Sequence, residues 1–183
     1  MNKVFVYLAT GFEEIEALTV VDLLRRAEIE VQTVSVHKDP IVKGAHHIPV
    51  TADTTIDALG NEMADMVVLP GGIPGIDNLY QSEKLRADVL RHAKKDRLIA
   101  AICAAPYVLH QLQLLDGKNY TCYPSVEERI DKGTHQDIPV VVDDKVITSQ
   151  GVGTALPFAG KLIEILKDKE TAERVLKEVL YQG

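Results

Sequence analysis

Short segments rich in apolar and β-branched residues alternate with longer amphipathic segments, and this alternation constrains the fold more than any other feature. The short segments cover residues 4–9, 31–36, 66–69 and 98–102. Runs of this kind are typical of strands buried on both faces of a sheet. The amphipathic segments, with helical spacing, cover residues 14–27, 82–95, 154–167 and 169–180. The alternation predicts an α/β fold with a mostly parallel sheet and helices on both faces.

Residues 140–142 and 145–148 form two further apolar runs around Asp143-Asp144, a pattern typical of a tight hairpin. This hairpin predicts one antiparallel strand at a side of the sheet. Residues 37–55 look irregular, apart from a short strand pair expected near residues 48–50. We expect one domain over residues 1–183, because this length suits a single core and no linker or repeat interrupts the chain.

Charge and hydropathy argue against several classes of protein. The net charge of −7 and the pI of about 5.3 disfavour nucleic acid or an anionic membrane surface as a partner. No apolar run approaches the ~18 residues that a membrane-spanning helix needs. The first residues do not resemble an export signal, so we expect a cytoplasmic protein whose two cysteines remain thiols.

Cys103 stands directly after the apolar run 98–102 and directly before a predicted helix. Ligands of parallel sheets bind beyond the carboxyl ends of the strands, which is where this residue is expected. Small neighbours on both sides would let the backbone turn sharply, as in a nucleophile elbow. The helix N-terminus would favour the thiolate, which predicts a thiol pKa well below its usual value. The alternative is a buried cysteine that acts as a small apolar side chain.

Two other loops fall at the same end of the predicted sheet. Residues 70–75, with three glycines, follow the strand 66–69, and their backbone amides are candidate oxyanion donors. The alternative for this loop is a plain tight turn. Glu16 lies in the first turn of the first predicted helix and is expected to face inward over the strand ends. Burial would raise the pKa of its carboxyl, which could then donate a hydrogen bond to a thiolate.

Three segments, 11–16, 68–72 and 101–106, resemble in their order and spacing the ThiJ/PfpI family, and within it the branch of the parkinsonism-associated deglycase. A fourth segment, 148–154, is similar to a late strand-to-helix turn of that branch. The resemblance implies a flavodoxin-like three-layer sandwich of the class I glutamine-amidotransferase type and a homodimer. It also implies that Cys103 is the reactive cysteine, that Glu16 hydrogen-bonds it, and that the amides of Gly71, Gly72 and Ala104 line the site.

The sequence departs from the family pattern at two positions. Ala104 stands where the protease-like branches have His, so a Cys-His pair is absent and peptidase chemistry is not expected. Tyr123 stands where the deglycase-like branch often has a His, and we expect it to hydrogen-bond a ligand in the pocket. The neighbouring Cys122 is either a second oxidisable thiol of the pocket or a partly buried strand residue. No cofactor is expected, and no histidine spacing suggests a metal.

Two functions remain open. In the first, a Cys103 thiolate supported by Glu16 acts on small reactive carbonyls, as a cofactor-independent glyoxalase or deglycase. In the second, Cys103 is oxidised by peroxide to sulfenate or sulfinate without substrate turnover, in an oxidative-stress sensor or chaperone. The missing histidine slightly favours the second, because sensing needs no general base.

Overall fold

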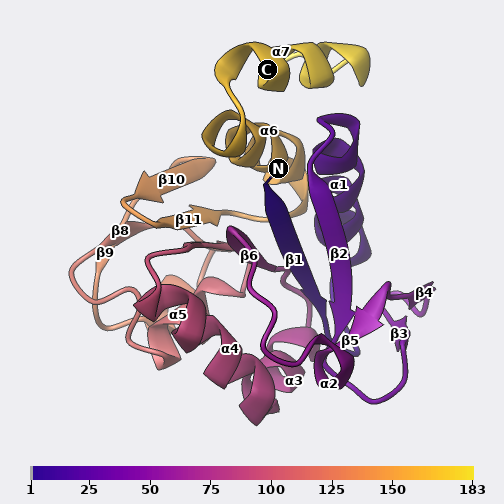
Figure 1. Cartoon of the computed structure of the whole chain (residues 1–183). Helices are drawn as coiled ribbons and strands as arrows, with labels where there is room; N and C mark the ends of the chain where they lie inside the picture. The colour runs from indigo at the N-terminus through magenta and orange to yellow at the C-terminus, as the bar shows by residue number, and fades with distance from the viewer. Residues whose placement is uncertain (1) are drawn as a thin grey trace.

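The structure is a computed structural model that describes residues 2–183, and its centre is a seven-stranded sheet. Figure 1 shows this sheet with helices packed on either side of it. The strand order is β10-β11-β7-β6-β1-β2-β5. In chain order these strands are β1 (Lys3–Leu8), β2 (Glu30–Ser35), β5 (Thr54–Thr55), β6 (Met66–Leu69), β7 (Leu98–Ile102), β10 (Val140–Asp143) and β11 (Val146–Ser149).

Each neighbouring pair that the described residues form in this sheet is parallel, except for the hairpin of β10 and β11. Without the edge strands β5 and β10, the order of the remaining strands is second, first, third, fourth and fifth along the chain, read from the β2 side. This is the flavodoxin-like order, in which ligands bind at the carboxyl ends where the winding reverses beside the first strand. The predicted fold class is confirmed, and the switch point lies between β1 and β6.

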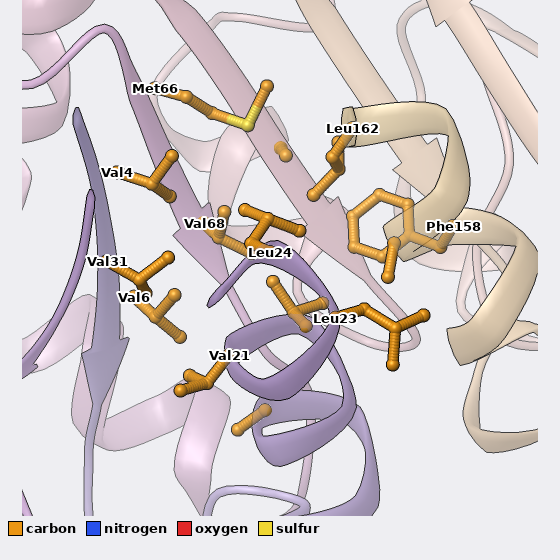
Figure 2. Close-up of a cluster of buried hydrophobic side chains, with 14 of the residues drawn as sticks. Val4, Val6, Val21, Leu23, Leu24, Val31, Met66, Val68, Phe158 and Leu162 are labelled. Carbon is orange, nitrogen blue, oxygen red and sulfur yellow. The ribbon is translucent and has the colours of Figure 1, made fainter. Parts of the chain in front are cut away.

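Successive residues of the strands face opposite helix layers. Val4 and Val6 pack with α1 (Glu14–Arg26), α6 (Ala155–Leu166) and α7 (Lys169–Glu178). Figure 2 shows this layer, where Leu24, Phe158 and Leu162 converge on the sheet. Phe5 and Tyr7 point to the other face. That face is covered by α2 (Ile56–Leu59), α3 (Gly75–Gln81), α4 (Glu83–Lys94) and α5 (Pro106–Gln111).

Smaller elements complete the chain and include several that the sequence did not predict. The hairpin of β3 (Ile41–Lys43) and β4 (Pro49–Thr51) matches the expected strand pair. Helix α3 was not predicted, nor was the parallel pair of β8 (Asn119–Tyr120) and β9 (Thr134–His135). The 3₁₀ turns are η1 (Glu127–Arg129) and η2 (Val152–Thr154). Within residues 2–183, no helix combines the length and the apolar character needed to cross a bilayer.

Candidate functional site

Cys103 occupies the turn between β7 and α5 in a left-handed backbone conformation, with φ of +65°. Its amide donates to the Ser149 carbonyl at 2.9 Å, and its carbonyl accepts from the Tyr123 amide at 2.8 Å. A residue other than glycine in this conformation costs on the order of 1 kcal/mol or more, which the surrounding structure must offset. The sharp turn predicted from the sequence is therefore present, and two neighbouring segments fix it.

Glu16 points from the first turn of α1 into the space beside Cys103, and none of its surface is exposed. Its Oε2 accepts from the Gly71 amide at 2.9 Å. Its other oxygen, Oε1, is buried and has no hydrogen-bond partner among residues 2–183. Burial raises the pKa of Glu16 to about 7, although its hydrogen bonds to the Cys103 thiol and the Gly71 amide oppose the rise. The inward orientation and the raised pKa agree with the sequence prediction.

The expected backbone amides come from the loop after β6 and from the turn after β7, and they interact with two different side chains. The amides of Gly72 and Ala104 hydrogen-bond the Cys103 sulfur, while the Gly71 amide holds Glu16. A Cβ on Gly71 would lie 2.6 Å from Cys103 Cβ and 2.8 Å from Glu16 Oε2. Glycine at 71 is therefore what allows the carboxyl and the thiol to approach each other.

The predicted depression of the Cys103 pKa is wrong for this arrangement. Burial, followed by the charge of Glu16 and its hydrogen bond, raises the pKa of the thiol above its ordinary value, and the Ala104 and Gly72 amides only partly oppose this. The following helix α5 is six residues long and begins at Pro106, so its positive end is weak and set back from the sulfur. Above about pH 7 the thiol and the carboxyl therefore hold one proton between them, and a thiolate requires that Glu16 carry it.

The cavity above Cys103 has a volume of about 430 Å³, which suits a small molecule. Its lining residues are Glu13, Glu16, Gly72, Cys103, Tyr123, Pro124, Gln150, Gly151, Val152, Gly153 and Thr154. No Lys, Arg or His is among these residues, so the described wall carries carboxyls but no positive charge. Tyr123 lies at this cavity with about half of its surface exposed.

Cys122 does not line the cavity, in contrast to its predicted place in the pocket. It is 1% exposed and packs in the core on the α5 side of the sheet, with its sulfur toward Glu127. Adjacent residues of an extended segment point to opposite sides, so the exposure of Tyr123 directs Cys122 inward. Glu13 is a lining residue that sequence reasoning missed, because it reads as one of several acids that begin a helix.

Comparison with known protein families and proteins gives a consistent result. Residues 2–165 match the model of the DJ-1/PfpI family. The chain belongs to the DJ-1/PfpI family. It is 39% identical over 182 residues to the protein dj-1beta of Drosophila melanogaster, covering 98% of this chain and 97% of that one. The glutathione-independent glyoxalase DJR-1.2 of Caenorhabditis elegans is 33% identical over 169 residues, covering 90% of this chain and 88% of that one.

Family members differ in length while their common fold is closely similar. The match to DJ-1 homolog B of Arabidopsis thaliana covers 95% of this chain but only 40% of that protein, with 37% identity over 176 residues. The solved structure of oxidized DJ-1 from Toxoplasma gondii has a TM-score of 0.97 and 38% identity, with complete coverage of both chains. The resemblance inferred from the motifs therefore extends to the whole DJ-1/PfpI domain.

Proposed function

We propose that this protein is a glyoxalase that converts small 2-oxoaldehydes to 2-hydroxy acids without a cofactor. The observation that carries the proposal is the isolated pair of Cys103 and Glu16 at the base of a small cavity, with a carboxyl pKa of about 7. A group that titrates near the working pH can both give and take a proton. The glyoxalase name of the relative DJR-1.2 supports the same chemistry.

In the proposed reaction, the Cys103 thiolate adds to the aldehyde carbon, and protonated Glu16 gives its proton to the aldehyde oxygen. Ionised Glu16 then removes the hydrogen of that carbon as a proton and returns it to the neighbouring carbon. The hydroxyl proton on the former aldehyde oxygen moves to the ketone oxygen, which becomes a hydroxyl, and the former aldehyde carbon becomes the carbonyl of a thioester with Cys103. Water hydrolyses the thioester, which releases the hydroxy acid and restores the thiol.

The charges of the cavity wall favour an uncharged substrate. Glu13 and Glu16 are the charged residues among those lining the cavity. An anionic carbonyl compound, such as a 2-oxo acid, would meet like charge and no cationic partner there. Methylglyoxal, which is small and neutral, fits both the volume and the charge of the site.

The test is lactate production from methylglyoxal in the absence of glutathione. Cys103→Ser and Glu16→Gln should each lower kcat/KM by at least about 100-fold, the range expected for loss of a nucleophile or proton carrier. Glu173→Gln, at an exposed position of α7, is the matched control and should keep the activity. A wild-type rate equal to that of Cys103→Ser would exclude the proposal.

A redox role is the second candidate, and the observation that favours it is the absence of an imidazole among the described lining residues. Peroxide would transfer one oxygen atom to the Cys103 thiolate, which becomes the sulfenate, and the rest of the peroxide would leave as water. The amides of Gly72 and Ala104 and a protonated Glu16 are placed to hydrogen-bond the added oxygen. Mass spectrometry after mild peroxide should find oxidation at Cys103 first. Equal oxidation of the methionines would remove the support.

We also propose that the protein is a homodimer. Ile15 and Leu18 are exposed on α1 by 53% and 38%. Ile48 is 52% exposed, and its amide lies 3.5 Å from the carboxylate of Glu14, the neighbour of Ile15 in the chain. Together they form an apolar surface that a second copy would cover. Sedimentation analysis should give a dimer for the wild type and a monomer for Leu18→Glu. A monomeric wild type would contradict this.

A further inference from the structure

A second group of reactive side chains lies behind the wall of the cavity, on the inner side of Tyr123. It consists of Cys122, which follows β8, Glu127, which begins η1, and His135, which ends β9. One ligand atom from each, the sulfur, a carboxylate oxygen and a ring nitrogen, lie within 4.8 Å of one another. None of the three lines the Cys103 cavity. They are therefore a separate cluster.

Backbone pairing brings these side chains together from distant positions. In the parallel pair of β8 and β9, Tyr120 is the register partner of His135, and the Gln136 amide donates to the Tyr120 carbonyl at 2.8 Å. The Val126 amide donates to the Tyr123 carbonyl at 3.0 Å, and this turn brings the chain back toward Cys122. The cluster is thus held by three backbone segments rather than by flexible side chains alone.

The polar atoms of the cluster are poorly satisfied. Cys122 is 1% exposed, and its sulfur lies 3.9 Å from Glu127 Oε2, which is long for a hydrogen bond. That contact is the only side-chain hydrogen bond of Glu127 in residues 2–183. The Nε2 atom of His135 is buried and has no hydrogen-bond partner among the described residues. Buried polar atoms without partners are costly, and each such group calls for an explanation.

We propose that Cys122, Glu127 and His135 bind a divalent transition-metal ion, with Zn²⁺ as the best match. Thiolate, imidazole and carboxylate are the donors that zinc sites use, with a water molecule as the fourth ligand where the protein supplies three. Cys122 binds as the thiolate and its proton leaves to solvent. A dication with one thiolate and one carboxylate is neutral overall, which suits a site with little solvent.

The geometry needs only a small contraction. With metal–ligand distances of about 2.0–2.3 Å, ligand atoms around a tetrahedral ion lie roughly 3.3–3.7 Å apart. The sulfur–oxygen distance of 3.9 Å is a few tenths of an ångström too long, and the upper limit of 4.8 Å requires a closure of about 1 Å. Rotation of the Glu127 and His135 side chains, neither of which is fully buried, can supply this closure.

No metal was expected from the sequence, because the separations of these three residues match no common zinc motif. The ligands meet only once β8 and β9 have paired. An ion here would join β8, η1 and β9, and so stiffen the segment that carries Tyr123. Because the Tyr123 amide also holds the Cys103 carbonyl, the site supports the cavity wall from behind.

The test uses Co²⁺ as a spectroscopic probe in a Cys103→Ala background, which removes the other thiol. The full-length protein should bind one Co²⁺ per chain with a sulfur-to-cobalt charge-transfer band, and Zn²⁺ should displace it. Cys122→Ser should abolish the band. Glu127→Gln and His135→Gln should weaken Zn²⁺ binding by at least the roughly 10- to 100-fold known for lost outer-sphere partners of zinc sites.

Glu128→Gln is the matched control, since Glu128 is the exposed neighbour of Glu127 on the same 3₁₀ turn. It should leave Zn²⁺ binding unchanged. Thermal unfolding without metal checks that each variant folds, and added Zn²⁺ should raise the Tm only where the three ligands are intact. Absence of the charge-transfer band, its persistence in Cys122→Ser, or equal weakening by Glu127→Gln and Glu128→Gln would each overturn the proposal. If Cys122→Ser does not fold, the comparison of Zn²⁺ binding by Glu127→Gln and Glu128→Gln decides whether the proposal stands.

Discussion

Replacing Glu16 by glutamine should stabilise the protein at alkaline pH while it removes the activity. The folded protein raises the pKa of this carboxyl from 4.5 to about 7. A raised pKa means that the folded state prefers the protonated carboxyl. The protonated carboxyl therefore contributes its full stabilisation below pH 4.5. That stability is lost as the pH rises through about 7. The difference between the Glu16 pKa values of the folded and unfolded states corresponds to about 3 kcal/mol in the free energy of unfolding.

A glutamine side chain at this position would imitate the protonated carboxyl, because its oxygen can accept from the Gly71 amide and its nitrogen can donate to Cys103. Glu16→Gln should therefore exceed the wild type by less than about 1 kcal/mol at pH 5 and by about 3 kcal/mol at pH 8. Urea unfolding with reductant present, at pH 5, 6, 7 and 8, measures this difference. Glu173→Gln should stay within about 0.5 kcal/mol of the wild type throughout. A Glu16→Gln advantage that does not grow with pH would refute the reasoning.

The same site leads to three more predictions. The kcat/KM for methylglyoxal should rise about tenfold per pH unit below the Glu16 pKa of about 7 and level off above it, as a pH–rate profile will show. Gly71→Ala should cost about 1–3 kcal/mol in urea unfolding and most of the activity, because its Cβ would overlap Cys103. The matched Gly153→Ala, where a Cβ meets nothing within 4 Å, should cost far less stability. A maleimide should label Cys103 much faster than the buried Cys122 in the native protein, by peptide mass spectrometry.

The parallel sheet was predictable because its strands are buried on both faces, and burial leaves a direct mark on composition. Residues 66–69 and 98–102 were placed correctly for this reason. The strands β8 and β9 were not predictable, since each has two residues and is defined only by its pairing partner. Helix α3 was missed because Pro74 and Gly75, which begin it, are more typical of turns.

The sequence predicted the central pair of the candidate site, but it misplaced Cys122, missed Glu13 and gave the wrong direction for the Cys103 pKa. Cys103 and Glu16 come together as expected, because both follow strands whose carboxyl ends meet at the same edge of the sheet. The sign of the Cys103 pKa shift was wrong, because the sequence shows a following helix but not its short length or the depth of the sulfur. Desolvation and the nearby carboxylate outweigh the amides of Gly72 and Ala104. A balance of opposing effects of this kind depends on distances, which composition and spacing do not contain.

The first turn of α1 carries three successive residues with three different tasks. The Glu14 carboxylate accepts from the His46 amide in the loop between β3 and β4, Ile15 is exposed, and Glu16 reaches the Cys103 sulfur. A second copy bound over Ile15 would therefore press on the same turn that sets the proton shared with Cys103. Dilution would then dissociate the dimer, and the first turn of α1 would become less ordered in each monomer. The reactivity of the thiol would then depend on how much of the protein a cell contains.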